Sequence, residues 1–428
     1  MAAAAAAGAT PATARKALLT TTATLLSSSV ARSRRSLSCS AAAASAAPRI
    51  APQPPDLLRW VQREGGFVHP ALRVVDHPEH GLGVSAAAAE GDIPPGDVLI
   101  ALPGRLPLRL RRPAGAADAV LVQLADQVPE ELWAMRLGLR LLQERAKSDS
   151  FWWPYIANLP ETFTVPIFFP GEDIKNLQYA PLLHQVNKRC RFLLEFEKEV
   201  KHKLGTVPLE DHPFCGQDVV AETKIDQNAA VTLNYGCYPN DFFLLDYGFV
   251  ITSNSYDQVE LSYDGTLLDA ASMAAGVSSP NFSAPAKWQQ DILSQLNLYG
   301  EGAILKVSIG GPEIVDGRLL AALRVIIAAD PDAVSGHDLK TLMSLKEKAP
   351  LGPAVEASAL RTVLALCTFA LQHFHTKIME DEAILKREPP LTTELAVQFR
   401  LQKKLLLLDV IQNLSRRIKM LALDKSTV

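Results

Sequence analysis

The stretch Leu233–Val250, LNYGCYPNDFFLLDYGFV, decides the fold expected for this chain. It contains two Tyr-Gly pairs, Tyr235-Gly236 and Tyr247-Gly248, with an apolar block between them. Considered alone, such a stretch predicts a strand, a turn at Gly236–Asn240 and a short buried segment. Its tyrosines would then be half-buried residues whose hydroxyls find a hydrogen-bond partner. The two pairs at this spacing are a more specific signal than any single tyrosine.

The composition is that of a globular protein with a large core. The chain has 428 residues, of which 48% are hydrophobic and 21% charged, so it has room for roughly two or three domains. The net charge of −3 conceals an asymmetry, because no acidic residue precedes Asp56 while six basic residues do. The remainder therefore carries a net charge of −9. A mature chain that is so acidic is not expected to bind nucleic acid.

Residues 1–55 have the composition of a cleaved targeting peptide. They are rich in Ala, Ser and Thr, carry scattered Arg and lack acidic residues, which is typical of import into a chloroplast or mitochondrion. A secretory signal fits less well, since Ala17–Val30 is full of hydroxyl side chains and makes a poor apolar core. A disordered tail is the remaining alternative. We expect import, with the chloroplast stroma ahead of the mitochondrion.

The cysteines and the hydropathy exclude several classes of protein. The five cysteines are scattered and no C-x-x-C occurs, which argues against a disulfide framework or a zinc site. No uninterrupted run of 18 apolar residues is present, so no membrane-spanning segment is expected.

The order of expected elements is strands first and helices later. Short strands are predicted at Leu72–Val75, Leu82–Ser85 and Val98–Leu102, each beside a turn. Helical periodicity then predicts a helix from Trp133 toward Lys147 and a long one over Leu182–Leu204. After Val250, a further strand is expected at Val259–Tyr263.

The spacing of the two Tyr-Gly pairs resembles the C-terminal signature of SET-domain protein-lysine methyltransferases, in particular the plant Rubisco large-subunit methyltransferase-like branch. The resemblance implies an α+β fold, in which a SET-domain β fold with a helical insertion is joined to a C-terminal all-α substrate-binding domain. It assigns residues 56–277 to the SET domain and residues 278–428 to the helical domain. The implied reaction transfers methyl groups from S-adenosyl-L-methionine to a lysine of a stromal protein, of the Rubisco large-subunit or aldolase class.

The same resemblance assigns the site residues. It places the hydroxyl of Tyr235 near the methyl-transfer axis as the catalytic group, and Tyr247 and Phe249 at the wall of the lysine channel. Methyl transfer is an in-line displacement, and it needs an aligned, unprotonated amine in a narrow desolvated channel. A hairpin would hold the cofactor, because glycine lets backbone amides approach a ligand; its residues are His80, Gly81, Leu82 and Gly83. The Gly-Leu-Gly triplet alone is more typical of a plain turn, and only the Tyr-Gly stretch downstream favours a cofactor-binding hairpin.

The chain departs from the family pattern at one point. In the family, an Arg-containing segment and an Asn-His pair that holds the cofactor precede the Tyr-Gly stretch, but Asn-His occurs nowhere in this sequence. The chain passes directly from residues 211–219 to residues 220–233, so we interpret the join near Val219-Val220 as the loss of an internal segment. Losing two or three polar partners of a zwitterionic cofactor costs roughly 1–3 kcal/mol each. The sequence therefore predicts weakened cofactor binding.

The C-terminal region is expected to be helical. Asp316 is a predicted N-cap, and helices are predicted over about 354–374 and 392–423. Asp381 and Glu382 resemble an acidic pair of the family's substrate-binding domain, although acids that stabilise a helix N-terminus explain them better. The basic side chains of the last helix are interpreted as a solvated face; they are Arg400, Lys403, Lys404, Arg416, Arg417 and Lys419.

Two functions from different classes stay open. The first is a methyltransferase whose partners are S-adenosyl-L-methionine and a chloroplast protein with a target lysine. The second is a non-catalytic binding module that docks a protein through the helical domain, which the absent Asn-His pair favours. A monomer that binds neither nucleic acid nor membrane is expected in both cases.

Overall fold

A computed structural model describes residues 49–51, 53–77, 81–87, 91–108, 128, 133–147, 149–202, 217–277, 281–328, 330–346 and 349–424. The chain forms two compact units, which we call the sheet unit (Ser40–Thr164 and Asn187–Gly236) and the helical unit (Val165–Val186 and Cys237–Val428). The boundary expected after residue 277 by resemblance stays a prediction. Residues 1–48 of the expected targeting peptide lie outside the described residues.

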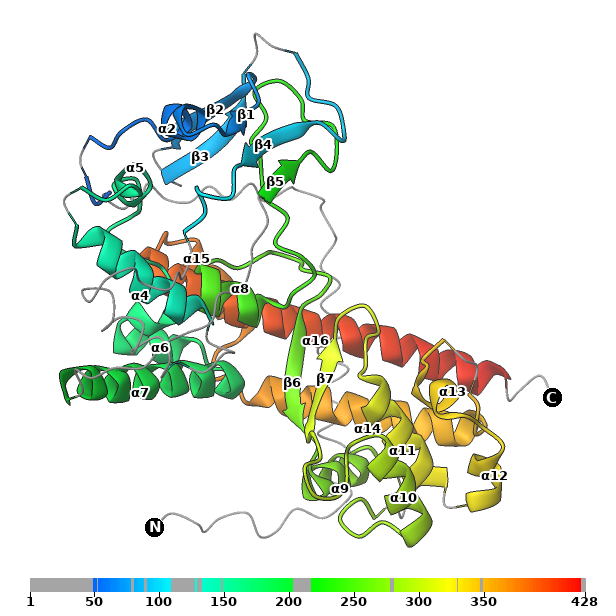
Figure 1. The fold of residues 1–428 in the computed structure, drawn as a ribbon. Coiled ribbons are helices and arrows are strands. Elements are labelled where there is room, and N and C mark those ends of the chain that lie inside the picture. The colour runs from blue at the N-terminus through cyan, green and yellow to red at the C-terminus, as the bar shows by residue number, and fades with distance from the viewer. Residues whose placement is uncertain are drawn as a thin grey trace. The chain divides into compact units, whose positions relative to one another are not determined.

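The sheet unit contains two small antiparallel sheets (Figure 1). One has the order β1-β4-β5, and the other pairs β2 with β3. The three strands predicted in this region are confirmed. The bounds of its elements are α2 Leu57–Arg63, β1 Phe67–Val68, β2 Leu72–His77, β3 Gly81–Ala86, β4 Val98–Leu102, α4 Trp133–Arg145, α5 Trp153–Ile156 and β5 Gln217–Val220.

A hydrophobic core lies between α2 and the strands of the sheet unit. Trp60 and Val61 of α2 are buried together with Val68, Leu72 and Leu99. The helix begins where Asp56 accepts a hydrogen bond from the amide of Arg59 at 3.1 Å, which is the usual chemistry of an N-cap. Burying these apolar side chains removes them from water and stabilises the unit.

The segment after β5 ties the two sheets together. Ile225 and Ile93 exchange backbone hydrogen bonds at 2.9 Å, and the amide of Val231 donates to the carbonyl of Val84 on β3 at 2.8 Å. Strand β5 runs unbroken through the join at Val219-Val220 and pairs with β4, although the register shifts beside Val98. The loss of an internal segment at this join stays a prediction.

The helical unit is built on the 34-residue helix α16 (Figure 1, red). This helix contacts α6, α8, α14, α15 and both strands of the antiparallel β6–β7 sheet. The predicted helices and the strand near Val259 are confirmed. The bounds are η4 Pro166–Phe168, α6 Gly171–Asn176, α7 Ala180–His202 (shared with the sheet unit), α8 Asn240–Tyr247, β6 Gln258–Ser262, α9 Gly265–Ala274, α10 Lys287–Gln295, β7 Lys306–Gly310, α11 Gly317–Ala328, α12 Pro331–Ser335, α13 Leu339–Met343, α14 Pro353–Gln372, α15 Ile378–Leu385 and α16 Leu391–Asp424.

Two expectations fail in the helical unit. The strand expected in Leu233–Val250 is wrong, because residues 240–247 form helix α8 and no strand lies in this stretch, whereas its buried segment is present as Phe243, Leu244 and Leu245 of that helix. The solvated basic face of the last helix is also wrong at Arg400, Lys403 and Lys404, which are buried. Their charges are accommodated because each finds acidic or carbonyl partners inside the unit, as the next section describes.

Helix α14 is the only described helix with the length and apolarity of a membrane span, with a mean hydropathy of 1.5 over 18 residues. Its neighbours α9, α11 and α16 pack against it, and its buried residues include Leu360, Val363 and Cys367. A helix buried in a protein core can have the same length and apolarity as a membrane span.

Candidate active site

The residues assigned to the site by sequence are divided between the two units. The β2–β3 hairpin belongs to the sheet unit, with His77 opposite Gly81 and Val75 opposite Gly83. His80 lies outside the described residues. A Cβ added at Gly83 would meet no atom within 4 Å, so one side of this backbone is open. An open glycine backbone fits a hairpin that holds a ligand, while its role stays a prediction.

Tyr235 ends the last segment of the sheet unit and is 41% exposed. The backbone around it is ordered by Asn234, whose Oδ1 accepts from the amide of Gly236 at 2.9 Å. The Nδ2 of Asn234 donates to Glu222 at 3.1 Å. Gly236 has φ of +89°, a conformation that favours glycine. The first Tyr-Gly pair is thus a turn held by an asparagine side chain.

The second Tyr-Gly pair ends helix α8 in the helical unit. Gly248 is left-handed, with φ 75° and ψ 30°, and its amide donates to the carbonyl of Leu244 at 3.2 Å. Glycine is the preferred residue for this helix termination. The chain therefore leaves the helix directly after Tyr247 and turns into Phe249.

An aromatic cluster surrounds Tyr247. Its ring lies 5.6 Å from that of Phe242 and 6.1 Å from that of Phe249. Phe249 in turn stacks on Phe243 at 5.2 Å. Tyr247 is 46% exposed, whereas Phe243 is buried. The two residues assigned to the lysine channel are thus together, in a surface backed by aromatic rings.

Asn240 closes the loop that carries these rings. Its side chain is fully buried; Oδ1 accepts from the amide of Ile251 at 2.9 Å, and Nδ2 donates to the carbonyl of Ile251 at 3.0 Å. The amide of Asn240 donates to Asp257 Oδ1 at 2.9 Å. The N-terminus of α8 is therefore capped by a carboxylate from the loop before β6, not by its own sequence neighbour.

Lys403 of α16 connects these groups to the rest of the helical unit. Its buried ammonium donates to Asp241, to Asp257 Oδ1 at 2.7 Å and to the carbonyl of Gln258 at 2.6 Å. Three donors meet three acceptors, which is the condition for burying a lysine. It also lies 5.0 Å from the ring centre of Phe399 and 5.3 Å from that of Tyr179, where cation–π attraction adds to its stabilisation.

The charges in this cluster do not cancel. Burial lowers the pKa of Lys403, but attraction from Asp241 and Asp257 outweighs it, so the pKa is raised. Burial raises the pKa of Asp241, and Lys403 opposes that shift. Two carboxylates share one ammonium, and for Asp241 the effect of burial outweighs that of Lys403, so its pKa is raised. Asp241 also borders a cavity of about 110 Å³ with Tyr179, Leu245 and Glu260.

Sequence reasoning missed Lys403, although a signal was present. Lys403 follows Phe399 by one helical turn and precedes Val410 by two, so it falls on the apolar stripe of the last helix. A lysine at a core position indicates an acidic partner elsewhere. Which acid it pairs with is not visible locally, because Asp241 lies more than 150 residues away.

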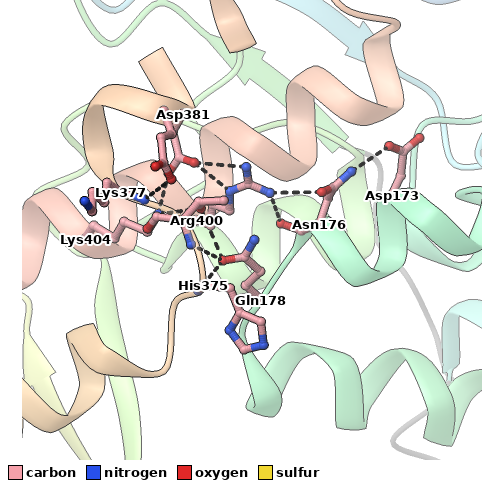
Figure 2. A network of polar contacts seen from close by, with 10 residues as sticks. Asp173, Asn176, Gln178, His375, Lys377, Asp381, Arg400 and Lys404 are labelled. Carbon is pink, nitrogen blue, oxygen red and sulfur yellow. Dashed lines mark hydrogen bonds and ion pairs between the residues drawn. The ribbon is translucent and has the colours of Figure 1, made fainter. Parts of the chain in front are cut away.

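A second buried cluster fixes α6 and α15 against α16 (Figure 2). Arg400 Nε donates to Asp381 Oδ1 at 3.0 Å, and Lys404 donates to Asp381 Oδ2 at 2.6 Å. Arg400 also donates to the carbonyl of Asn176 at 2.7 Å, while Gln178 accepts from the amide of His375 at 2.8 Å. Asp381 is completely buried. Asp381 cannot therefore contact a docked protein, and of the acidic pair only Glu382 is exposed.

No group of three or more His, Cys, Asp or Glu side chains in the part of the chain that the structure describes could hold a metal ion. Cys190, Cys237 and Cys367 are free thiols.

Comparison with known structures identifies the fold. The SET domain of LSMT bound to lysine and AdoHcy superposes with a TM-score of 0.57 at 17% identity, over 85% of this chain and 91% of that chain. Rubisco LSMT bound to AdoMet gives a TM-score of 0.55 at 20% identity, over 85% and 92%. In its fold the chain is similar to LSMT and its SET domain. Residues 280–407 match the family described as Rubisco LSMT substrate-binding, as the resemblance of the C-terminal region predicts. The α+β fold is confirmed by the small sheets and many helices of the chain together with these structural matches.

The LSMT-like chain also resembles curated enzymes over a shorter region. Actin-histidine N-methyltransferase of Mus musculus is 31% identical over 134 residues, and that of Homo sapiens is 30% identical over the same length. The match covers 31% of this chain but only 21% of either relative. The similarity therefore spans about a fifth of those proteins.

Proposed function

We propose that this LSMT-like chain is an S-adenosyl-L-methionine-dependent protein methyltransferase that modifies a lysine of a chloroplast protein. The observation that carries the proposal is the second Tyr-Gly pair, whose tyrosine lies half exposed among aromatic rings in an LSMT-like fold. Solved relatives are bound to AdoMet or AdoHcy, and one is bound to lysine. The similarity to actin-histidine methyltransferases makes histidine the alternative acceptor.

Each part of the chain has a role in this proposal. The hairpin residues Gly81, Leu82 and Gly83, of which Gly83 has open space beside its backbone, would hold the cofactor, which supplies a methyl group on a sulfonium for displacement by a nitrogen. Tyr247 and Phe249 would wall the acceptor channel and exclude water, which lowers the pKa of a lysine and favours its nucleophilic form. The hydroxyl of Tyr235 would orient the nitrogen by hydrogen bonding. Residues 280–407 would dock the protein substrate.

Tyr247 tests the acceptor channel. Replacing it (Tyr247→Ala) is expected to lower methyl transfer to the Rubisco large subunit or aldolase at least about tenfold, because the acceptor loses its aromatic wall. The measurement is incorporation of labelled methyl groups by the full chain. Tyr155→Ala removes a tyrosine that is 39% exposed and lies outside both the assigned site and residues 280–407, and it is the matched control. Equal activity of the two variants would contradict the assigned role.

The second candidate is a non-catalytic docking module. The absence of an Asn-His pair from the sequence favours it. Calorimetry of the full chain with S-adenosyl-L-methionine separates the two, with a thermal melt to show that the sample is folded. Micromolar binding, on the order of −8 kcal/mol, supports the methyltransferase. A folded protein without binding supports the docking module.

A further inference from the structure

The helical unit pins the loop that carries Tyr247 at both of its ends. At one end, Lys403 binds Asp241 in the first turn of α8. At the other end, Asn240 holds both the amide and the carbonyl of Ile251. Because Tyr247 and Phe249 lie between these points along the chain, their backbone cannot move far unless one of the two attachments opens.

Both attachments are linked to the ammonium of Lys403, the first directly through Asp241 and the second through Asp257, which binds Asn240. Asp257 receives Lys403 on Oδ1, and the same carboxylate binds the amide of Asn240 at 2.9 Å and its Nδ2 at 3.2 Å. Asp257 is buried, and so is Asn240. Without the ammonium, the carboxylates of Asp241 and Asp257 would face each other with no cation between them. The side chain of Asp257 is 4% exposed and that of Asp241 is 25% exposed. Uncompensated buried charge is strongly unfavourable, so without the ammonium the cluster would have to open or take up a proton.

We propose that Lys403 is a positioning residue: through Asp241, Asp257 and Asn240 it holds the loop with Tyr247 and Phe249 in the conformation that presents both rings. Lys403 lies on α16, whose residues up to 407 belong to the region matching the substrate-binding family. The docking region and the acceptor wall are thus joined by buried charge. The functional part of this inference rests on the proposed methyltransferase activity.

Hydrogen exchange tests the positioning without any need for activity. The amides of Ile251 and Asn240 each donate to a side chain of the cluster at 2.9 Å, so their exchange reports its opening. In Lys403→Met we expect both amides to exchange at least about tenfold faster, while buried amides of α14 keep their rates. Lys419→Met changes an exposed lysine of the same helix and should leave all of these rates unchanged.

The outcomes are distinct. Unchanged exchange at Ile251 and Asn240 overturns the proposal, and so does an equal acceleration throughout the helical unit. If Lys403→Met does not fold, the double variant Asp241→Asn with Lys403→Met removes one of the two opposed carboxylates, and the same local acceleration is expected. In an active chain, the KM for the acceptor protein rises about tenfold while the KM for S-adenosyl-L-methionine stays constant. Wild-type protein without methyl transfer would refute the proposed function and leave the exchange experiment valid.

Discussion

Buried ions control the interior of the helical unit at the scale of single residues. Arg324, Arg400 and Lys403 are each fully buried. Each is surrounded by carboxylates and carbonyls from other elements, and the network around Arg400 joins α6, α15 and α16 (Figure 2). A buried charge is tolerated only when its partners are in place, so removing a partner costs more than the intact pair contributes. These side chains therefore specify which elements pack together.

Arg324 gives a direct test of this principle. It binds Glu356 through Nε at 2.7 Å and Nη2 at 2.8 Å, and Nη1 donates to the carbonyl of Leu342 at 2.6 Å. Arg324→Met leaves a buried carboxylate and should lower the free energy of unfolding by about 3–5 kcal/mol. Urea denaturation measures this loss. Arg361→Met, at an exposed position of α14, should change it by less than about 0.5 kcal/mol; equal effects would contradict the role of burial.

Cys367 predicts how stability depends on pH. Burial raises the pKa of its thiol to about 12 from an ordinary 9.0. Above pH 9 the unfolded chain loses this proton while the native chain keeps it, so the free energy of unfolding falls as pH rises, by up to about 1.4 kcal/mol per pH unit. Cys367→Ala should show a flatter slope between pH 9 and 10 in urea titrations. Parallel slopes for the two proteins would refute the assignment.

At the scale of elements, α8 shows how a short helix is stabilised from outside. Its N-cap residue, Pro239, offers no side-chain hydrogen bond, and the free amide of Asn240 is bound instead by Asp257. Its C-terminus depends on the left-handed Gly248. A helix of two turns is not stable alone, so these distant partners decide that it forms.

Gly248 is the position where the end of α8 is most sensitive. Gly248→Ala places a Cβ in the left-handed region and should destabilise the protein by about 1 kcal/mol. The midpoint of urea denaturation measures it. Gly138→Ala is the matched control, because Gly138 lies inside α4 with open space at its Cβ. That change should be neutral or stabilising by roughly 0.5–1 kcal/mol. If Gly248→Ala leaves the midpoint of urea denaturation unchanged, the end of α8 does not require glycine at this position.

At the scale of the whole molecule, two sequence predictions concern processing: removal of residues 1–55 on import, and loss of an internal segment at Val219-Val220. If residues 1–55 direct import, protein isolated from plastids should begin between about residue 30 and Asp56, as judged by mass spectrometry of its N-terminus. A mature N-terminus upstream of residue 30 would contradict import. If import removes residues 1–55, the mature chain loses all six basic residues that precede Asp56, and its net charge changes from −3 to −9.

The join at Val219-Val220 belongs to the same scale. Sequencing transcripts across this point should find forms that contain the missing segment, if the segment was lost from one isoform. If every transcript lacks the segment, the loss is not specific to one isoform. The pairing of β5 with β4 would then be the normal structure of this protein.

The periodicity of the sequence was enough to locate α11, α14 and α16, because long amphipathic helices are recorded in local spacing. The Tyr-Gly pairs were likewise enough to indicate the LSMT-like fold. Only the tertiary structure showed that α8 is a helix and that Arg400, Lys403 and Lys404 are buried. The physical reason is the same in both cases. The partners that cap α8 and neutralise these cations lie from 17 to 162 residues away, and local sequence carries no record of which distant group will meet them.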